Sequence, residues 1–89
     1  MKWRIETSKD AEKFFRKNQL TRIEALKLIK RSICYFQGED INIDIKKLTG
    51  KWSGFYRIRR GKIRIIAEFN FENSFVFIEE IDWRGNVYK

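Results

Sequence analysis

The chain has 89 residues and a net charge of +8, from 20 Lys and Arg against 12 Asp and Glu, which is enough for one small domain and favours a polyanionic partner. It contains one Cys and no His, so an internal disulfide, a cysteine-based zinc site and a histidine-based catalytic pair are excluded. Its apolar runs are too short to cross a membrane, and its alternating first residues do not resemble a signal peptide, so we expect a cytoplasmic protein with no membrane partner.

The N-terminal segment predicts a strand followed by a helix. Residues 2–6 alternate apolar and charged side chains, as a strand with one buried face does. Thr7 or Ser8 can cap the helix that follows, because either hydroxyl can accept a hydrogen bond from the first turn. We expect this helix to end near Lys17.

A second helix is predicted between Thr21 and Gly38. Thr21 and Glu24 have the spacing of a capping box, and Gly38 can adopt the left-handed conformation that ends a helix. Apolar residues recur at steps of three and four, and we expect this stripe to face the core: Ile23, Leu26, Ile29, Ile33 and Phe36.

The second half of the chain predicts a sheet. Residues 41–48 alternate weakly, and we interpret them as a partly ordered connection. Residues 54–60, 62–70 and 74–81 are rich in β-branched and aromatic side chains, and the short gaps between them indicate antiparallel neighbours. The expected fold is α+β in the order β-α-α-β-β-β, with an antiparallel sheet of about four strands, both helices on one face, and a single domain over residues 1–89.

Basic side chains are concentrated in the centre of the chain. Residues 45–64 contain eight Lys and Arg and no acidic residue. Strand alternation places Arg57 and Arg59 on the face opposite the apolar set. A turn at residues 61–62 puts Arg59 opposite Arg64, whereas a turn at residues 60–61 puts Arg57 opposite Arg64, and both registers place all three arginines on one face.

Facing arginines destabilise a sheet, so their convergence favours a function over a merely solvated face. Guanidinium groups match the geometry of phosphate oxygens, which predicts binding of a nucleic-acid backbone. Trp52, Phe55 and Tyr88 are candidates for stacking on bases, which suits single-stranded RNA. Further basic residues expected to bind RNA are Lys46, Lys47, Lys51, Arg60 and Lys62.

Three motifs give the sequence a resemblance to a known family. They are the KLTG of residues 47–50, the FYRIRRGKIRII of residues 55–66 and the RGNVY of residues 84–88. In this order and spacing the chain resembles the RelE/ParE toxin superfamily, and within it the RelE-like mRNA interferase branch. The resemblance implies a toxin of a type II toxin–antitoxin system that cleaves mRNA, usually in the ribosomal A site, and that a cognate antitoxin protein neutralises.

The resemblance also implies roles for individual residues. Arg57 and Arg59 match the strand positions that contact the scissile phosphate, and Arg64 matches the arginine that stabilises charge in the transition state. Tyr88 matches the tyrosine that orients or activates the attacking 2′-hydroxyl, and Arg84 matches a C-terminal basic position. We expect no cofactor and no metal requirement, because RNA supplies its own nucleophile.

Proton transfer must come from a residue other than histidine. A Tyr or Lys near several arginines can have a lowered pKa, since neighbouring cations favour its deprotonated form. Tyr88 is the first candidate and Lys46 or Lys47 the second, while Glu79 and Glu80 are possible bases that can equally face solvent or pair with a strand arginine. Two alternatives stay open: a ParE-like toxin that inhibits DNA gyrase without nuclease activity, and a passive RNA-binding module.

Overall fold

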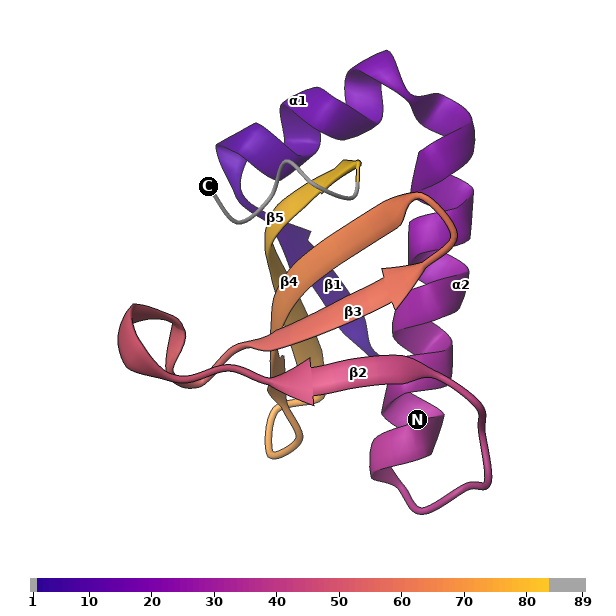
Figure 1. The fold of residues 1–89 in the computed structure, drawn as a ribbon, viewed down its shortest axis with the longest axis vertical. Coiled ribbons are helices and arrows are strands. Elements are labelled where there is room, and N and C mark those ends of the chain that lie inside the picture. Colours follow the sequence, from indigo (N-terminus) through magenta and orange to yellow (C-terminus); the bar gives the residue numbers. More distant parts are fainter. Residues whose placement is uncertain (1, 84–89) are drawn as a thin grey trace.

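The computed structural model describes residues 2–83, which form a five-stranded sheet with two helices packed on one face. The α+β class and the placement of both helices on one face are confirmed. The predicted site residues Arg84 and Tyr88 lie outside the described residues. In chain order the elements are β1 (Arg4–Thr7), α1 (Lys9–Lys17), α2 (Gln19–Phe36), β2 (Asp44–Lys47), the 3₁₀ turn η1 (Gly50–Trp52), β3 (Tyr56–Arg60), β4 (Ile63–Asn70) and β5 (Phe75–Trp83) (Figure 1).

The sheet has the strand order β1-β5-β4-β3-β2, and it differs from the expected sheet in two ways. The segment interpreted as a connection contains the short edge strand β2, which pairs antiparallel with β3. Strand β1 pairs parallel with β5, so the sheet is mixed. Figure 1 shows β2 and β3 running side by side, with the η1 loop projecting beyond them.

The helix boundaries confirm one predicted cap and correct the other. Ser8 caps α1, because its Oγ accepts a hydrogen bond from the Ala11 N–H at 3.1 Å. Thr21 does not cap α2, which begins at Gln19 after Asn18; Thr21 lies inside the helix and is buried. The chain passes from α1 to α2 through Asn18 alone, which leaves no room for a separate cap at Thr21. Neither helix in residues 2–83 is long and apolar enough to span a membrane.

One apolar core fills the space between the helices and the sheet. Phe15 of α1 and Ile29 of α2 pack against Ile58, Ile65 and Ile78 of the central strands, and all five are nearly or fully inaccessible to solvent. The predicted stripe on α2 is wrong at Ile23, which is 54% exposed, because the core-facing side of the helix is centred on Ala25, Leu28, Ile29 and Ile33.

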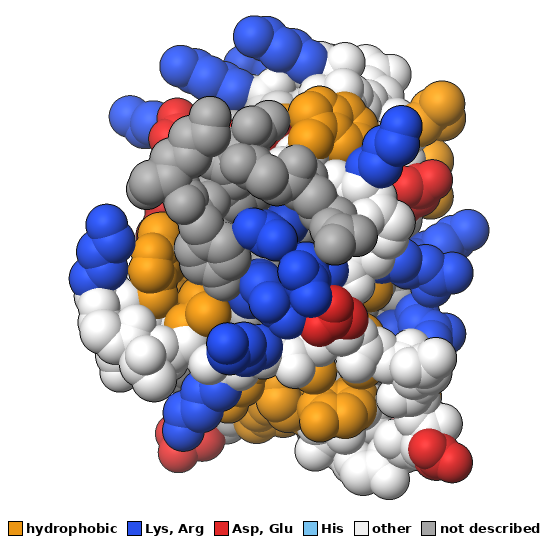
Figure 2. Space-filling view, in the orientation of Figure 1, with side chains coloured by type: hydrophobic (Ala, Val, Ile, Leu, Met, Phe, Trp, Pro, Cys, Tyr) orange, Lys and Arg blue, Asp and Glu red, His pale blue; other side chains and the backbone are white. Residues whose placement is uncertain are grey.

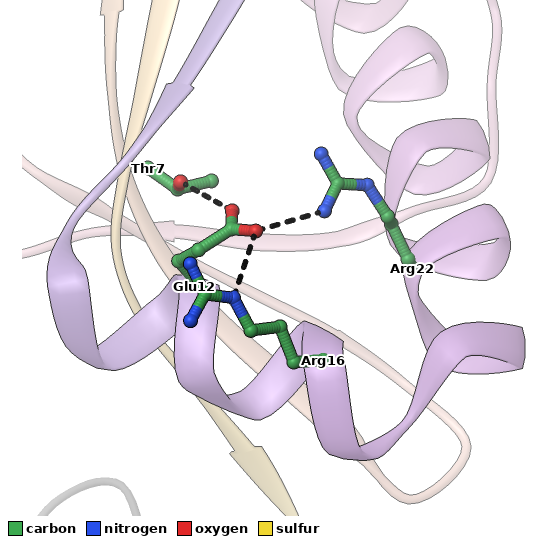
Figure 3. Close-up of polar contacts among 4 residues, drawn as sticks. All are labelled: Thr7, Glu12, Arg16 and Arg22. Atoms are coloured by element: carbon green, nitrogen blue, oxygen red, sulfur yellow. Dashed lines mark hydrogen bonds and ion pairs between the residues drawn. The ribbon is translucent and has the colours of Figure 1, made fainter.

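The carboxylate of Glu12 connects the first strand to both helices (Figure 3). Its Oε1 accepts a hydrogen bond from Thr7 Oγ1 at 3.2 Å, and its Oε2 lies 3.4 Å from Nη1 of Arg22 and 3.8 Å from Nε of Arg16. Because Glu12 is on α1 and Arg22 is on α2, this cluster bridges the two helices.

Candidate nucleic-acid interface

The β3–β4 hairpin brings the three predicted arginines together. Its turn is at residues 61–62, where Gly61 has a φ of +58°, and Arg59 lies directly opposite Arg64. This is the first of the two registers that the sequence allowed. Arg57, Arg59 and Arg64 alternate with core residues along their strands, so they lie on the face of the sheet away from both helices.

The strand registers arrange this face in two rows that cross β2, β3, β4 and β5. One row reads Asp44, Arg59, Arg64 and Asp82; the other reads Lys46, Arg57, Ile66 and Glu80. Basic side chains therefore occupy the middle of the face, and Figure 2 shows Lys and Arg side chains gathered there with an acidic side chain beside them. We call this surface the arginine face and define it by Lys46, Arg57, Arg59 and Arg64.

Asp44 bridges two of these arginines. Its Oδ1 accepts a hydrogen bond from Nη2 of Arg57 at 2.7 Å, and its Oδ2 accepts one from Nε of Arg59 at 2.9 Å. Partial burial would raise the pKa of Asp44, but the hydrogen bond from Arg59 and the positive charges of both arginines outweigh burial and lower this pKa below its ordinary value. Asp44 is thus held as a carboxylate between two guanidinium groups.

Arg57 is the least exposed of the three side chains in this cluster. Its side chain is 12% exposed, against 28% for Arg59 and 47% for Asp44. The Nε of Arg57 is buried without a hydrogen-bond acceptor among the described residues. Ile66, directly opposite Arg57, is fully buried although it lies outside the core cluster, which indicates an apolar floor under the long arginine stems. Charges on such a floor are less screened than charges in open solvent.

A β-bulge lies beside this floor. Ile66 pairs with Glu80, but Ala67 pairs with Ile78, so Glu79 is an extra residue in β5. Burial, followed by the negative charges of neighbouring carboxylates, raises the pKa of Glu80. A raised pKa leaves Glu80 protonated to a higher pH than an ordinary carboxyl group, so Glu80 is a candidate proton donor.

The other basic residues expected to bind RNA are distributed over different surfaces. Lys46 lies on the arginine face, directly opposite Arg57, whereas Lys47 lies opposite Tyr56 on the helix side of the sheet. Lys51 is exposed on η1.

Two of the aromatic residues predicted to stack on bases contact each other. Trp52 and Phe55 form an edge-to-face contact with their ring centroids 5.8 Å apart, and both are partly buried.

Arg60 and Lys62 line a second basic surface. Arg60 alternates away from Arg59, and both Arg60 and Lys62 border a cavity of about 700 Å³ between α2 and the β3–β4 turn. Lys27 and Arg31 of α2 line the same cavity. Arg60 thus points away from the arginine face, although it directly follows Arg59 in the sequence and borders a smaller hollow together with Arg59 and Asp44.

Asp44 is the residue that sequence reasoning missed. It lies one position before the acid-free segment, in the stretch interpreted as a connection. Its position between Ile43 and Ile45 was the available signal, because alternation places it on the polar face once that stretch is a strand.

Comparisons with solved structures support the fold. No protein-family model matches the chain, and no curated protein does. The chain is similar to a chain of the archaeal RelE–RelB complex of Pyrococcus horikoshii, with 22% identity, a TM-score of 0.65, and coverage of 97% of this chain and 99% of that one. It is also similar to the YoeB–YefM complex of Staphylococcus aureus (17% identity, TM-score 0.64, 94% and 99% covered) and to the toxin–antitoxin complex RelBE2 of Mycobacterium tuberculosis (19% identity, TM-score 0.62, 94% and 100% covered). The chain therefore has the RelE-like fold over nearly its whole length.

Proposed function

We propose that this protein is the toxin of a type II toxin–antitoxin system and acts as a metal-independent endoribonuclease on mRNA. The observation that carries the proposal is the convergence of Arg57, Arg59 and Arg64, with Lys46, on a sheet face that no described helix covers. Four cations over a buried apolar floor suit a phosphodiester with a developing extra negative charge. The likeness of the fold to structures named as toxin–antitoxin complexes adds to this support.

The proposed reaction uses the 2′-hydroxyl of the RNA as its nucleophile. The 2′-oxygen attacks the adjacent phosphorus in line with the P–O5′ bond, a base takes the 2′-hydroxyl proton, and the leaving 5′-oxygen accepts a proton. The products are a 2′,3′-cyclic phosphate and a free 5′-hydroxyl. Arg57 and Arg59 bind the non-bridging oxygens, and Arg64 stabilises the charge that accumulates on them.

Proton transfer needs a base and an acid in addition to these arginines. Tyr88 stays the first candidate for the base, and Arg84 remains a proposed cationic contact, on the resemblance of the C-terminal motif alone. Between the two lysine candidates, the position of Lys46 on the arginine face favours it over Lys47. The raised pKa of Glu80 makes it the candidate for the acid that protonates the leaving oxygen.

The proposed partners follow from charge and from the named complexes. An excess of positive charge fits both the ribosome-bound message and an acidic antitoxin. RelB and YefM accompany the toxins in the similar structures, and we expect an analogous protein to bind this chain in the cytoplasm.

A cleavage assay tests the proposal. Purified protein added to a translating extract should break messages at discrete positions and leave 2′,3′-cyclic phosphate ends. Arg64→Ala should reduce cleavage by at least about 100-fold, the usual cost of removing one charge-stabilising donor. Arg16→Ala, which removes an arginine that is 75% exposed on α1, should cut normally.

Two results would reject the proposal. Intact messages with arrested supercoiling by gyrase would favour the ParE-like alternative, and RNA binding without cleavage would favour a passive module. Equal cutting by Arg64→Ala and the unchanged protein would reject the role of the arginine face.

A further inference from the structure

Asp44 lies between Arg57 and Arg59, where the proposed function places the substrate phosphate. Its two oxygens accept hydrogen bonds from Arg57 at 2.7 Å and from Arg59 at 2.9 Å, so the carboxylate spans the two guanidinium groups in the way that two phosphate oxygens would. Arg57 is 12% exposed, so few of its donors can be reached while Asp44 stays in place.

We propose that Asp44 is a built-in competitor for the phosphate site and that RNA must displace its carboxylate from Arg57 and Arg59 in order to bind. The inference rests on the proposed function, because it assumes that these arginines receive a phosphodiester. Its consequence is a threshold: displacement of Asp44 weakens every phosphate ligand by the same factor, and a ligand with several phosphates has the added contacts to bind in spite of it.

Which ligands pass this threshold follows from the number of contacts that each ligand gains. A single phosphate ion exchanges one anion for another between the same two arginines, so its net gain is small. A polynucleotide keeps further phosphates on Lys46 and Arg64, and these added contacts offset the loss of the Asp44 ion pairs. Asp44 therefore lowers the affinity for free phosphate and mononucleotides, which are abundant small anions, to a level at which a polynucleotide with its further contacts still binds.

The surroundings of Asp44 allow the displacement. Asp44 is on the edge strand β2, and its side chain is 47% exposed. A hollow of about 350 Å³ adjoins it, lined also by Arg31, Arg59 and Arg60. Leu28 and Ile43 also border this hollow, but its cations and the exposure of Asp44 let the displaced carboxylate stay in water beside positive charge.

The test compares two substitutions that remove the same charge. Asp44→Asn removes the competing anion, whereas Asp40→Asn removes an exposed carboxylate from the loop before β2. The ligands are inorganic phosphate and a single-stranded RNA with 2′-O-methyl groups, which cannot be cleaved. A unit charge at about 4–5 Å in a solvated site changes affinity by about three- to tenfold. We expect Asp44→Asn to tighten binding of both ligands by that factor, and Asp40→Asn to change it less than about twofold.

A second measurement, on the unchanged protein, tests the proposal even if Asp44→Asn does not fold. The carboxyl ¹³C resonance of Asp44 reports its ionisation, and saturating RNA should raise the pKa of Asp44 because the carboxylate loses both arginine partners. Unchanged or weaker binding by Asp44→Asn, or an Asp44 pKa that RNA does not move, would overturn the proposal. Inorganic phosphate has no 2′-hydroxyl and cannot react, so its binding to the two variants tests the role of Asp44 even if the protein cleaves no message.

Discussion

Lys46 and Lys47 offer a matched pair for testing which face of the sheet binds RNA. They are neighbours on the same edge strand and are both exposed, yet Lys46 lies opposite Arg57 on the arginine face and Lys47 lies opposite Tyr56 on the helix side. Lys→Gln at either position removes one positive charge and keeps most of the side chain. The two variants therefore have the same net charge and differ only in the face that they alter.

The expected difference can be worked out from counterion release. Each phosphate contact with a single strand contributes about 0.7 to the slope of log affinity against log salt concentration. Between 1 M and 0.1 M salt, losing one contact therefore costs about 0.7 log units, or about fivefold in affinity at 0.1 M. We expect Lys46→Gln to lose about fivefold and to lower the slope by about 0.7, and Lys47→Gln to retain both values.

Fluorescence anisotropy with a labelled, uncleavable RNA at four or five salt concentrations measures both quantities. Equal losses in the two variants would show that only total charge matters and would refute the reasoning from strand faces. A larger loss in Lys47→Gln would place the RNA on the helix side of the sheet.

Three further predictions use the same structure. Arg59→Gln should reduce message cleavage at least tenfold more than Arg60→Gln, because only Arg59 lies on the arginine face; similar losses in a gel assay would contradict this. The pKa of Asp44 is lower in the folded chain, so its ion pairs stabilise the fold above the ordinary aspartate pKa of about 4 and lose that effect as pH falls below it. In urea denaturation, Asp44→Asn should lower the free energy of unfolding by less than about 1 kcal/mol at pH 7, since the pair is partly exposed. Stability should also fall less steeply at acidic pH in this variant; an unchanged slope would mean that other carboxylates cause the fall. Ser8→Ala should cost about 1–2 kcal/mol in the same assay, because Ser8 caps α1 and its hydroxyl also donates to the Glu79 carbonyl at 2.7 Å; a loss of a few tenths would mean that water replaces both bonds.

Strand alternation explains why the central hairpin could be predicted from the sequence. Arg57 and Arg59 alternate with Ile58, and the one glycine in the gap limits the turn to two positions. Alternation cannot choose between the two registers, since both keep the same side chains on the same face. The choice depends on pairing along the whole of β3 and β4, which places Arg59 opposite Arg64.

Other features depend on contacts between distant parts of the chain. Strand β2 has four residues, three of them charged, so its strand propensity is weak and its pairing with β3 decides its conformation. The parallel pairing of β1 with β5 joins residues about 70 positions apart, which no local pattern encodes. The sequence does contain one sign of the bulge, because the adjacent Glu79 and Glu80 interrupt the alternation of apolar and polar residues between Ile78 and Ile81.

The basic residues that the sequence predicts to bind RNA lie on more than one surface of the protein. Alternation alone separates Arg60 from Arg59 and Lys47 from Lys46, once residues 44–47 are taken as a strand. Charge density points to the β3–β4 hairpin, and strand geometry decides which basic side chains share a face.

A structure of the protein with an uncleavable single-stranded RNA tests the central claim most directly. The account predicts a phosphate group within hydrogen-bonding distance of Arg57 and Arg59, with Arg64 beside it and the carboxylate of Asp44 turned away. RNA bound instead in the cavity between α2 and the β3–β4 turn, with both Asp44 ion pairs intact, would contradict it.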